Sequence, residues 1–123
     1  MRLVKITTLV FVVFLAVPSE PTDVTVEALN STAIIVKWGL PINHMETGII
    51  KGYHIHVGQL DENEELIKSP ELLAMADNGD ATEMVIAGLQ PEMWYRIQVV
   101  AFTRKGDGIL SEAYKIKTKG AGE

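Results

Sequence analysis

The feature that most constrains the fold is the stretch MWYRIQVVAFT at residues 93–103, in which apolar and polar side chains alternate. Successive side chains of a β-strand point to opposite faces, so this alternation predicts a long strand with one buried face. That face carries Tyr95, Ile97, Val99 and Ala101. The glycine-containing stretch KGDG follows at 105–108, so the strand is expected to end in a hairpin turn.

Shorter alternating runs, separated by turn residues, recur along the chain after residue 20. They lie at 23–29, 32–40, 49–60, 83–89 and 111–118. The segment 66–82 is ambiguous: ELLAMA suits one helical turn, but Pro70 before it and DNGD after it favour an irregular edge strand. We count seven strands and no convincing helix, which predicts an all-β sandwich or barrel.

Length and charge limit the function classes. The chain has 123 residues, the size of one domain, with enough apolar residues for one core. Its net charge of −5 and the lack of a basic run argue against nucleic acid and, less strongly, against a sulfated glycan as main ligand. The absence of cysteine excludes disulfide scaffolds, thiolate zinc sites and cysteine nucleophiles.

The first residues bear on the compartment. Arg2 and Lys5 precede an apolar run, 6–17, that ends at Pro18 and Ser19. This run has 12 residues, whereas a membrane-spanning helix needs about 20. A charged head, a short apolar middle and a small residue are typical of a secretory signal peptide, so we predict one at 1–19 with cleavage near Ser19. The alternatives are a first strand of the domain or a misjoined upstream segment.

Residues 18–119 resemble a fibronectin type III domain. The opening PSEPTDVTV, the tryptophan on the second strand and the spacing Leu89-x-Pro91-x-x-x-Tyr95 carry the resemblance. That spacing matches the tyrosine corner, in which a tyrosine hydroxyl bonds the backbone upstream. The resemblance implies a seven-stranded antiparallel immunoglobulin-like β-sandwich at 20–119, with a tail or linker at 120–123. The expected core residues are Trp38, Tyr53, Leu89, Pro91 and Tyr95.

A narrower resemblance is to an extracellular repeat of the LAR-type receptor tyrosine phosphatases. It rests on GIIKGYHIHV at 48–57 and on the stretch from AGLQPEMWY to KIKTKGA at 87–121. It implies a non-catalytic recognition or spacer module of a cell-adhesion receptor, with protein partners or neighbouring domains at the cell surface. Phosphatase activity would belong to a longer parent protein. The alternatives are a domain of another cell-surface or secreted adhesion protein, and an intracellular muscle-type structural repeat.

Asn30-Ser31-Thr32 is an N-glycosylation sequon. In a secreted chain we predict a glycan on Asn30, in the turn between the first two strands. The alternative is that these three residue types simply suit a turn.

Lys105, Gly106 and Asp107 lie where a well-known type III repeat displays its integrin-binding tripeptide. The alternative is turn chemistry, because a hairpin here needs glycines at positive φ. We favour the turn, so integrin binding is not expected.

Two further groups of residues stand out. His54 and His56 alternate on one strand with His44 in the preceding loop, but two solvent-facing histidines are a better interpretation than a metal site. Trp94, Val100 and Phe102 share the outward face of the sixth strand, so they form either a contact patch or a surface covered by Arg96 and Lys115. No catalytic motif is present, so no cofactor, metal or small-molecule substrate is predicted.

Overall fold

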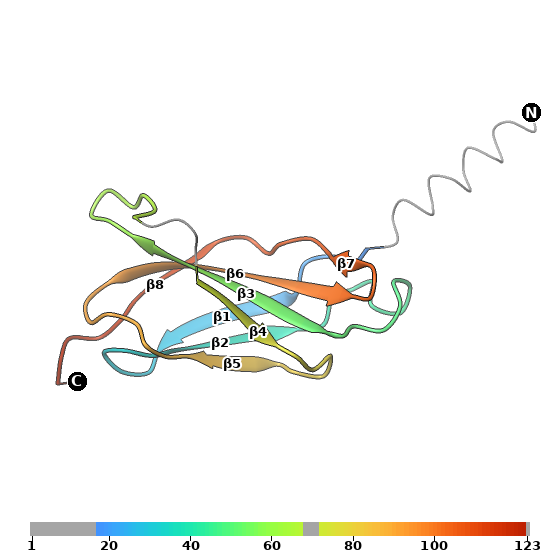
Figure 1. Cartoon of the computed structure of the whole chain (residues 1–123), viewed down its shortest axis with the longest axis horizontal. Coiled ribbons are helices and arrows are strands. Elements are labelled where there is room, and N and C mark those ends of the chain that lie inside the picture. Colours follow the sequence, from blue (N-terminus) through green and yellow to red (C-terminus); the bar gives the residue numbers. More distant parts are fainter. Residues whose placement is uncertain (1–16, 68–71, 123) are drawn as a thin grey trace, which may run out of the picture.

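A computed structural model describes residues 17–67 and 72–122, which form strands and loops only (Figure 1). The strands are β1 (Thr22–Ala28), β2 (Ile34–Gly39), β3 (Gly52–Leu60), β4 (Leu72–Ala76), β5 (Glu83–Ile86), β6 (Trp94–Thr103), β7 (Gly106–Asp107) and β8 (Tyr114–Lys117). Among these residues there is no helix that is long and apolar enough to cross a membrane.

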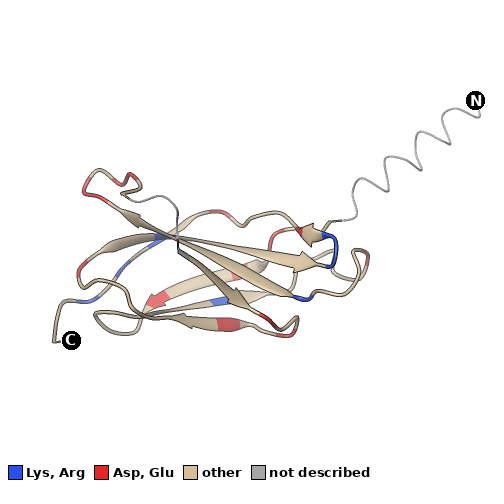
Figure 2. Ribbon diagram, viewed as in Figure 1, with Lys and Arg blue, Asp and Glu red and all other residues tan. Residues whose placement is uncertain are grey.

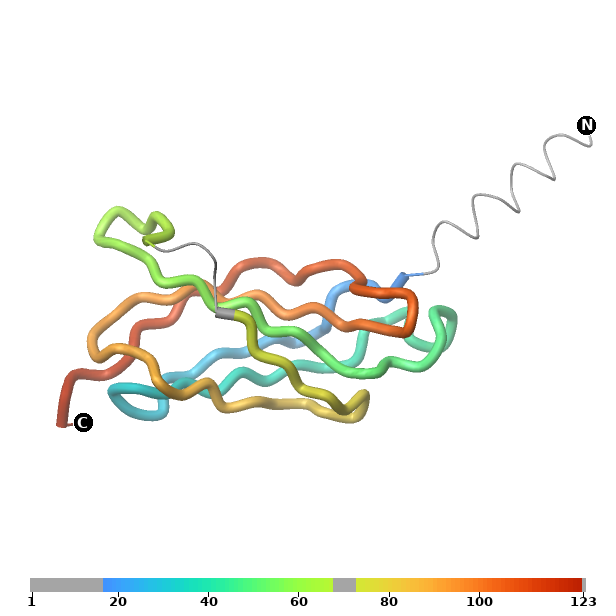
Figure 3. Tube along the Cα trace, in the orientation of Figure 1, coloured from blue at the N-terminus to red at the C-terminus, as the bar shows by residue number. Residues whose placement is uncertain are grey.

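The strands form two antiparallel sheets that pack face to face (Figure 3). One sheet has the order β1-β2-β5, and the other has the order β4-β3-β6, with β7 and β8 both pairing with β6. The predicted all-β sandwich is therefore confirmed. So is the edge strand in the ambiguous segment, which is β4.

The predicted strand count differs from the structure at the end of the chain. The hairpin after β6 returns as the two-residue strand β7, and pairing with β6 resumes only at β8. Ser111 bridges the interruption: its N–H donates to the Val99 carbonyl at 2.8 Å, and its Oγ accepts from the Val99 N–H at 2.9 Å. A buried side chain thus supplies a hydrogen bond that a continuous strand would supply from its backbone.

The register of β3 against β6 builds the core. Tyr53, Ile55 and Val57 lie opposite Ala101, Val99 and Ile97, and all six are buried between the sheets. From the other sheet, the Trp38 ring reaches Tyr53 with a centroid separation of 5.1 Å and an interplanar angle of 47°. The buried face predicted from the alternation at 93–103 is confirmed.

The described chain begins inside the packed domain. Pro18 is fully buried, and its carbonyl accepts the Ile109 N–H at 2.9 Å. The Ser19 N–H and hydroxyl both donate to Asn43 Oδ1, at 2.8 and 3.0 Å. Residues 18 and 19 thus contact the domain, and the boundary predicted after residue 19 stays a prediction. The rest of the predicted signal peptide, residues 1–16, lies outside the described residues.

Candidate interaction site

The corner between the sheets is built around Tyr95. Its ring is buried, and its hydroxyl accepts the Gln90 N–H at 2.8 Å. Leu89 is buried beside it and donates its N–H to the Thr32 carbonyl at 2.9 Å. The Tyr95 bond ties the β5–β6 connection to β6, as in a tyrosine corner, and the Leu89 bond ties it to the β1–β2 turn.

Pro91 is exposed, so its expected place in the core is wrong. A proline in a turn acts through its fixed φ and does not need burial. The sequence reasoning also missed Thr118, which is buried directly after β8. The Thr118 hydroxyl donates to the Gln90 carbonyl at 2.6 Å and accepts the Met93 N–H at 3.0 Å.

Asn30 lies in the exposed turn between β1 and β2. Its Oδ1 accepts the Thr32 N–H at 2.9 Å and lies 3.4 Å from the Thr32 hydroxyl. The Asn side chain thus closes a local turn, as the alternative to glycosylation requires. The amide nitrogen has no bonded partner among the described residues, so both interpretations fit this geometry.

The stretch KGDG is part of a hairpin whose tip is Arg104–Lys105. Gly106 has a φ of 123°, as the turn requires. Gly108 does not have a positive φ, contrary to the prediction, and is needed instead for space, because a Cβ there would collide with the Pro18 carbonyl. Asp107 is in β7, and its carboxylate oxygen lies 3.0 Å from His54 Nδ1.

The three side chains of the predicted outward patch differ in exposure. Trp94 is 45% exposed and Phe102 is half-buried, but Val100 is only 1% exposed. Val100 lies directly opposite His54, whose ring stacks on Phe102 at a centroid distance of 4.5 Å. Larger neighbours therefore cover the short valine, and the predicted patch is wrong at this position.

The three histidines do not meet. His44 Nδ1 is 3.0 Å from the Pro41 carbonyl oxygen, whereas His54 is paired with Asp107. Within the described ranges, no group of three or more His, Cys, Asp or Glu side chains is placed to hold a metal ion.

The model of the fibronectin type III domain matches residues 19–117. The chain belongs to the fibronectin type III family. It is a non-catalytic module of the kind that recurs in cell-surface adhesion receptors.

The relatives of this fibronectin type III domain include receptor phosphatases. Tyrosine-protein phosphatase Lar of Drosophila melanogaster is 46% identical over 105 residues, which are 85% of this chain and 5% of that protein. Receptor-type tyrosine-protein phosphatase F of Mus musculus is 40% identical over 106 residues, 85% of this chain and 6% of that protein. The chain thus spans about one-twentieth of the length of these curated relatives.

A solved structure covers the same region. The crystal structure of the FN5 domain of Drosophila Lar is 41% identical, with a TM-score of 0.68, and the match covers 85% of this chain and 100% of that domain. The FN1–FN3 domains of chicken CNTN1 match with a TM-score of 0.68 at 28% identity, over 83% of this chain and 32% of that one. The predicted resemblance to LAR-type repeats is confirmed.

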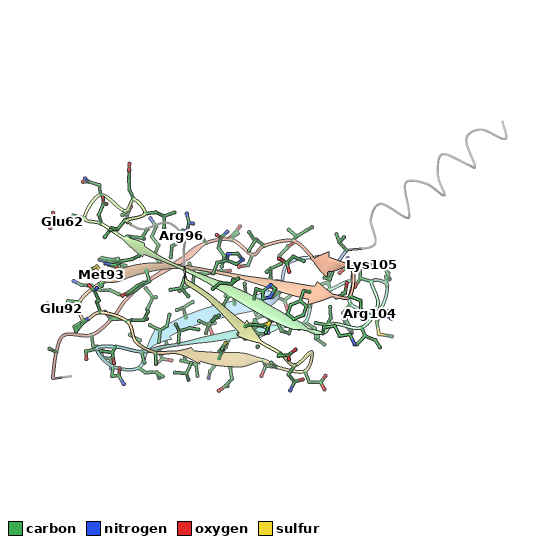
Figure 4. All side chains as sticks on the ribbon, in the orientation of Figure 1. Glu62, Glu92, Met93, Arg96, Arg104 and Lys105 are labelled. Atoms are coloured by element: carbon green, nitrogen blue, oxygen red, sulfur yellow. The ribbon has the colours of Figure 1, made fainter. Side chains whose placement is uncertain are left out.

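Both ends of this fibronectin type III domain carry acidic and basic residues (Figure 2). Arg104 and Lys105 form the hairpin tip at one end, and Glu62 and Glu92 lie at the other (Figure 4). The β2–β3 loop and the β6–β7 turn meet at the first end, where Thr47, Lys51, Arg104 and Lys105 line one hollow. Sequence reasoning missed this surface, because its residues come from segments about fifty positions apart.

Proposed function

We propose that this fibronectin type III domain is an extracellular recognition or spacer module of a cell-adhesion receptor of the LAR phosphatase type. The observation that carries the proposal is the match to the whole FN5 domain of Drosophila Lar at 41% identity. The loops at both ends and the outer sheet face offer surfaces for protein partners or neighbouring domains. Phosphatase activity belongs to a longer parent protein, because this chain has no cysteine nucleophile.

The extracellular location and the glycan are tested together. Expression in secretory cells, followed by mass spectrometry of the N-terminus and of Asn30, is expected to show removal of a leader and a glycan on Asn30. Since Pro18 and Ser19 are packed in the domain, we propose that the mature chain begins at or before Val17. A retained Met1 together with an unmodified Asn30 would contradict the secreted form and favour an intracellular structural repeat.

Integrin binding is not expected. Asp107 lies within β7, beside the hairpin tip, and its carboxylate pairs with His54. An integrin-binding aspartate would have to leave this contact to reach a receptor. Cell attachment to the purified domain and to its Asp107→Ala variant is therefore expected to be equal. Attachment that requires Asp107 would establish the ligand interpretation instead.

A further inference from the structure

The β2–β3 loop carries the most exposed large apolar side chains of the described residues. Ile42, Met45 and Ile49 are 83%, 84% and 79% exposed. Exposed apolar residues are common singly, but a contiguous group marks an interaction site. These three lie within eight positions of one loop, so their exposure is concentrated at one end of the sandwich.

Two hollows flank this loop, and Gly48 and Ile49 line both of them. The first, of about 380 Å³, lies between the loop and the β6–β7 turn. The second, of about 410 Å³, lies on the other side and includes Met45 in its wall. Ile49 therefore stands as an apolar ridge between two depressions, a shape that a partner's side chains can fill on both sides.

Three cations, Lys51, Arg104 and Lys105, line the first hollow, which has no acidic residue in its wall. Among the described residues, none of the three forms an ion pair. Asp107, the acidic residue nearest in sequence to the turn, is paired with His54. In a chain with 16 acidic and 11 basic residues, this is a local excess of positive charge, which a partner's carboxylates would complement.

The wall of the first hollow also contains an unsatisfied hydroxyl. Thr47 is buried, and its Oγ1 makes no hydrogen bond within the described part of the chain. An unsatisfied buried hydroxyl costs about 1–3 kcal/mol. If a partner placed an oxygen atom in the hollow, a rearrangement of this loop would let the Thr47 hydroxyl donate a hydrogen bond to it.

We propose that Ile42, Met45, Ile49, Lys51, Arg104 and Lys105, here called the loop-end surface, bind a protein segment that carries carboxylates beside a large apolar side chain. This inference rests on the proposed function and names its partner class. The carboxylates contact the cations of the first hollow, and the apolar side chain packs on Ile49. A sulfated glycan or an anionic membrane surface would meet the cations, but neither supplies the single large apolar side chain that packs on Ile49.

The test is an NMR titration of the ¹⁵N-labelled domain, residues 17–122, with the synthetic peptide Asp-Glu-Leu-Trp-Glu-Asp. Saturable amide shifts are expected at residues 42–51 and 103–107 and not at the other end of the sandwich. A matched peptide with Asn and Gln in place of the acids, and one with Ser in place of Leu and Trp, are each expected to bind at least about fivefold more weakly, because both contacts contribute.

Two variants locate the binding. K51E/R104E/K105E and I42S/M45S/I49S are each expected to weaken binding by about tenfold or more. K115E/K117E/K119E reverses the same number of charges at the opposite end and is expected to bind like the wild type. Dispersed spectra show that each variant is folded, since all the altered side chains are exposed.

Several results would overturn the inference. One is the absence of localised amide shifts at millimolar peptide. Another is binding of the neutral peptide as tightly as the acidic one. A third is binding of the acidic peptide by both loop-end variants as tightly as by the wild type. Tighter binding of a sulfated disaccharide or of phosphatidylserine vesicles at the same residues would assign the surface to a glycan or a membrane instead. None of these results bears on secretion or on Asn30, so failure here is distinguishable from failure of the proposed function.

Discussion

At the scale of single residues, two buried tyrosines show how one hydroxyl can be used in opposite ways. Tyr95 accepts a backbone hydrogen bond from Gln90, whereas the Tyr53 hydroxyl has no partner among the described residues. Both rings fill the core. The difference lies only in whether the oxygen, once removed from water, regains a hydrogen bond.

Tyr95→Phe is expected to lower the free energy of unfolding by about 1–2 kcal/mol, because the Gln90 N–H loses its acceptor. Tyr53→Phe is expected to change it by less than about 1 kcal/mol, or to raise it, because the substitution removes an unsatisfied buried oxygen. Urea unfolding of both variants measures the difference. An equal loss in the two proteins would show that the corner hydrogen bond contributes nothing specific.

Tyr53 also makes stability depend on pH. Burial raises its pKa above the ordinary value of 10.0, and the negative charge of Asp80 raises it further. The folded state therefore holds this proton more tightly than the unfolded chain. The resulting stability is complete below pH 10 and is lost as the pH rises through the folded-state pKa. Unfolding free energies measured upward from pH 9.5 are expected to fall less steeply for Tyr53→Phe than for the wild type; parallel curves would contradict this.

At the scale of elements, β3 is the strand on which the larger sheet depends. It pairs with β4 on one side and with β6 on the other. Gly52, at its start, lies where the Ala76 carbonyl and the Phe102 ring approach the same backbone. Glycine is needed here for space, and its φ is not positive.

Gly52→Ala is expected to cost about 1–3 kcal/mol, since a Cβ would lie 2.9 Å from two atoms of the Phe102 ring and would also press on Ala76. Hydrogen exchange is expected to increase most in β4. Gly48→Ala is the control, because a Cβ at this position would meet no atom within 4 Å. Its φ of 91° is unfavourable for alanine, so we expect only a backbone cost of about 1–2 kcal/mol. Unchanged exchange in β4 would show that the edge strand does not depend on Gly52.

At the scale of the whole molecule, the described chain starts at one end of the sandwich and finishes at the other (Figures 1 and 3). The start is held by Pro18 and Ser19, which contact the β7–β8 segment and the β2–β3 loop. These contacts connect the entry of the chain to the same end that carries the loop-end surface.

A chain that begins at residue 20 is expected to be about 1–3 kcal/mol less stable than one that begins at residue 17. It loses the buried Pro18 side chain and the hydrogen bonds of Pro18 and Ser19. Thermal and urea unfolding of the two proteins measure the loss. Identical midpoints would mean that these contacts add no stability and that a boundary at Ser19 is tolerated.

Much of this fold could be predicted because its information is local. Alternation assigned Ile55 and Val99 to the buried face, and the spacing from Leu89 to Tyr95 identified the corner. The errors occurred where the outcome depended on residues distant in the chain. Val100 alternates as an outward residue, but it is covered from β3. The hydrogen bond from Ile109 to Pro18 likewise joins segments that no local pattern brings together.

The sequence by itself determined most of the strands, their inward faces, the glycine at the hairpin and the family, because periodicity and spacing act between near neighbours in the chain. Only the tertiary structure decided which surfaces are usable. It paired Asp107 with His54, buried Val100, and brought Lys51 beside Arg104 and Lys105 around one hollow. Burial and charge pairing depend on which side chains lie opposite and beside each residue on neighbouring strands, and these strands are far apart in the chain.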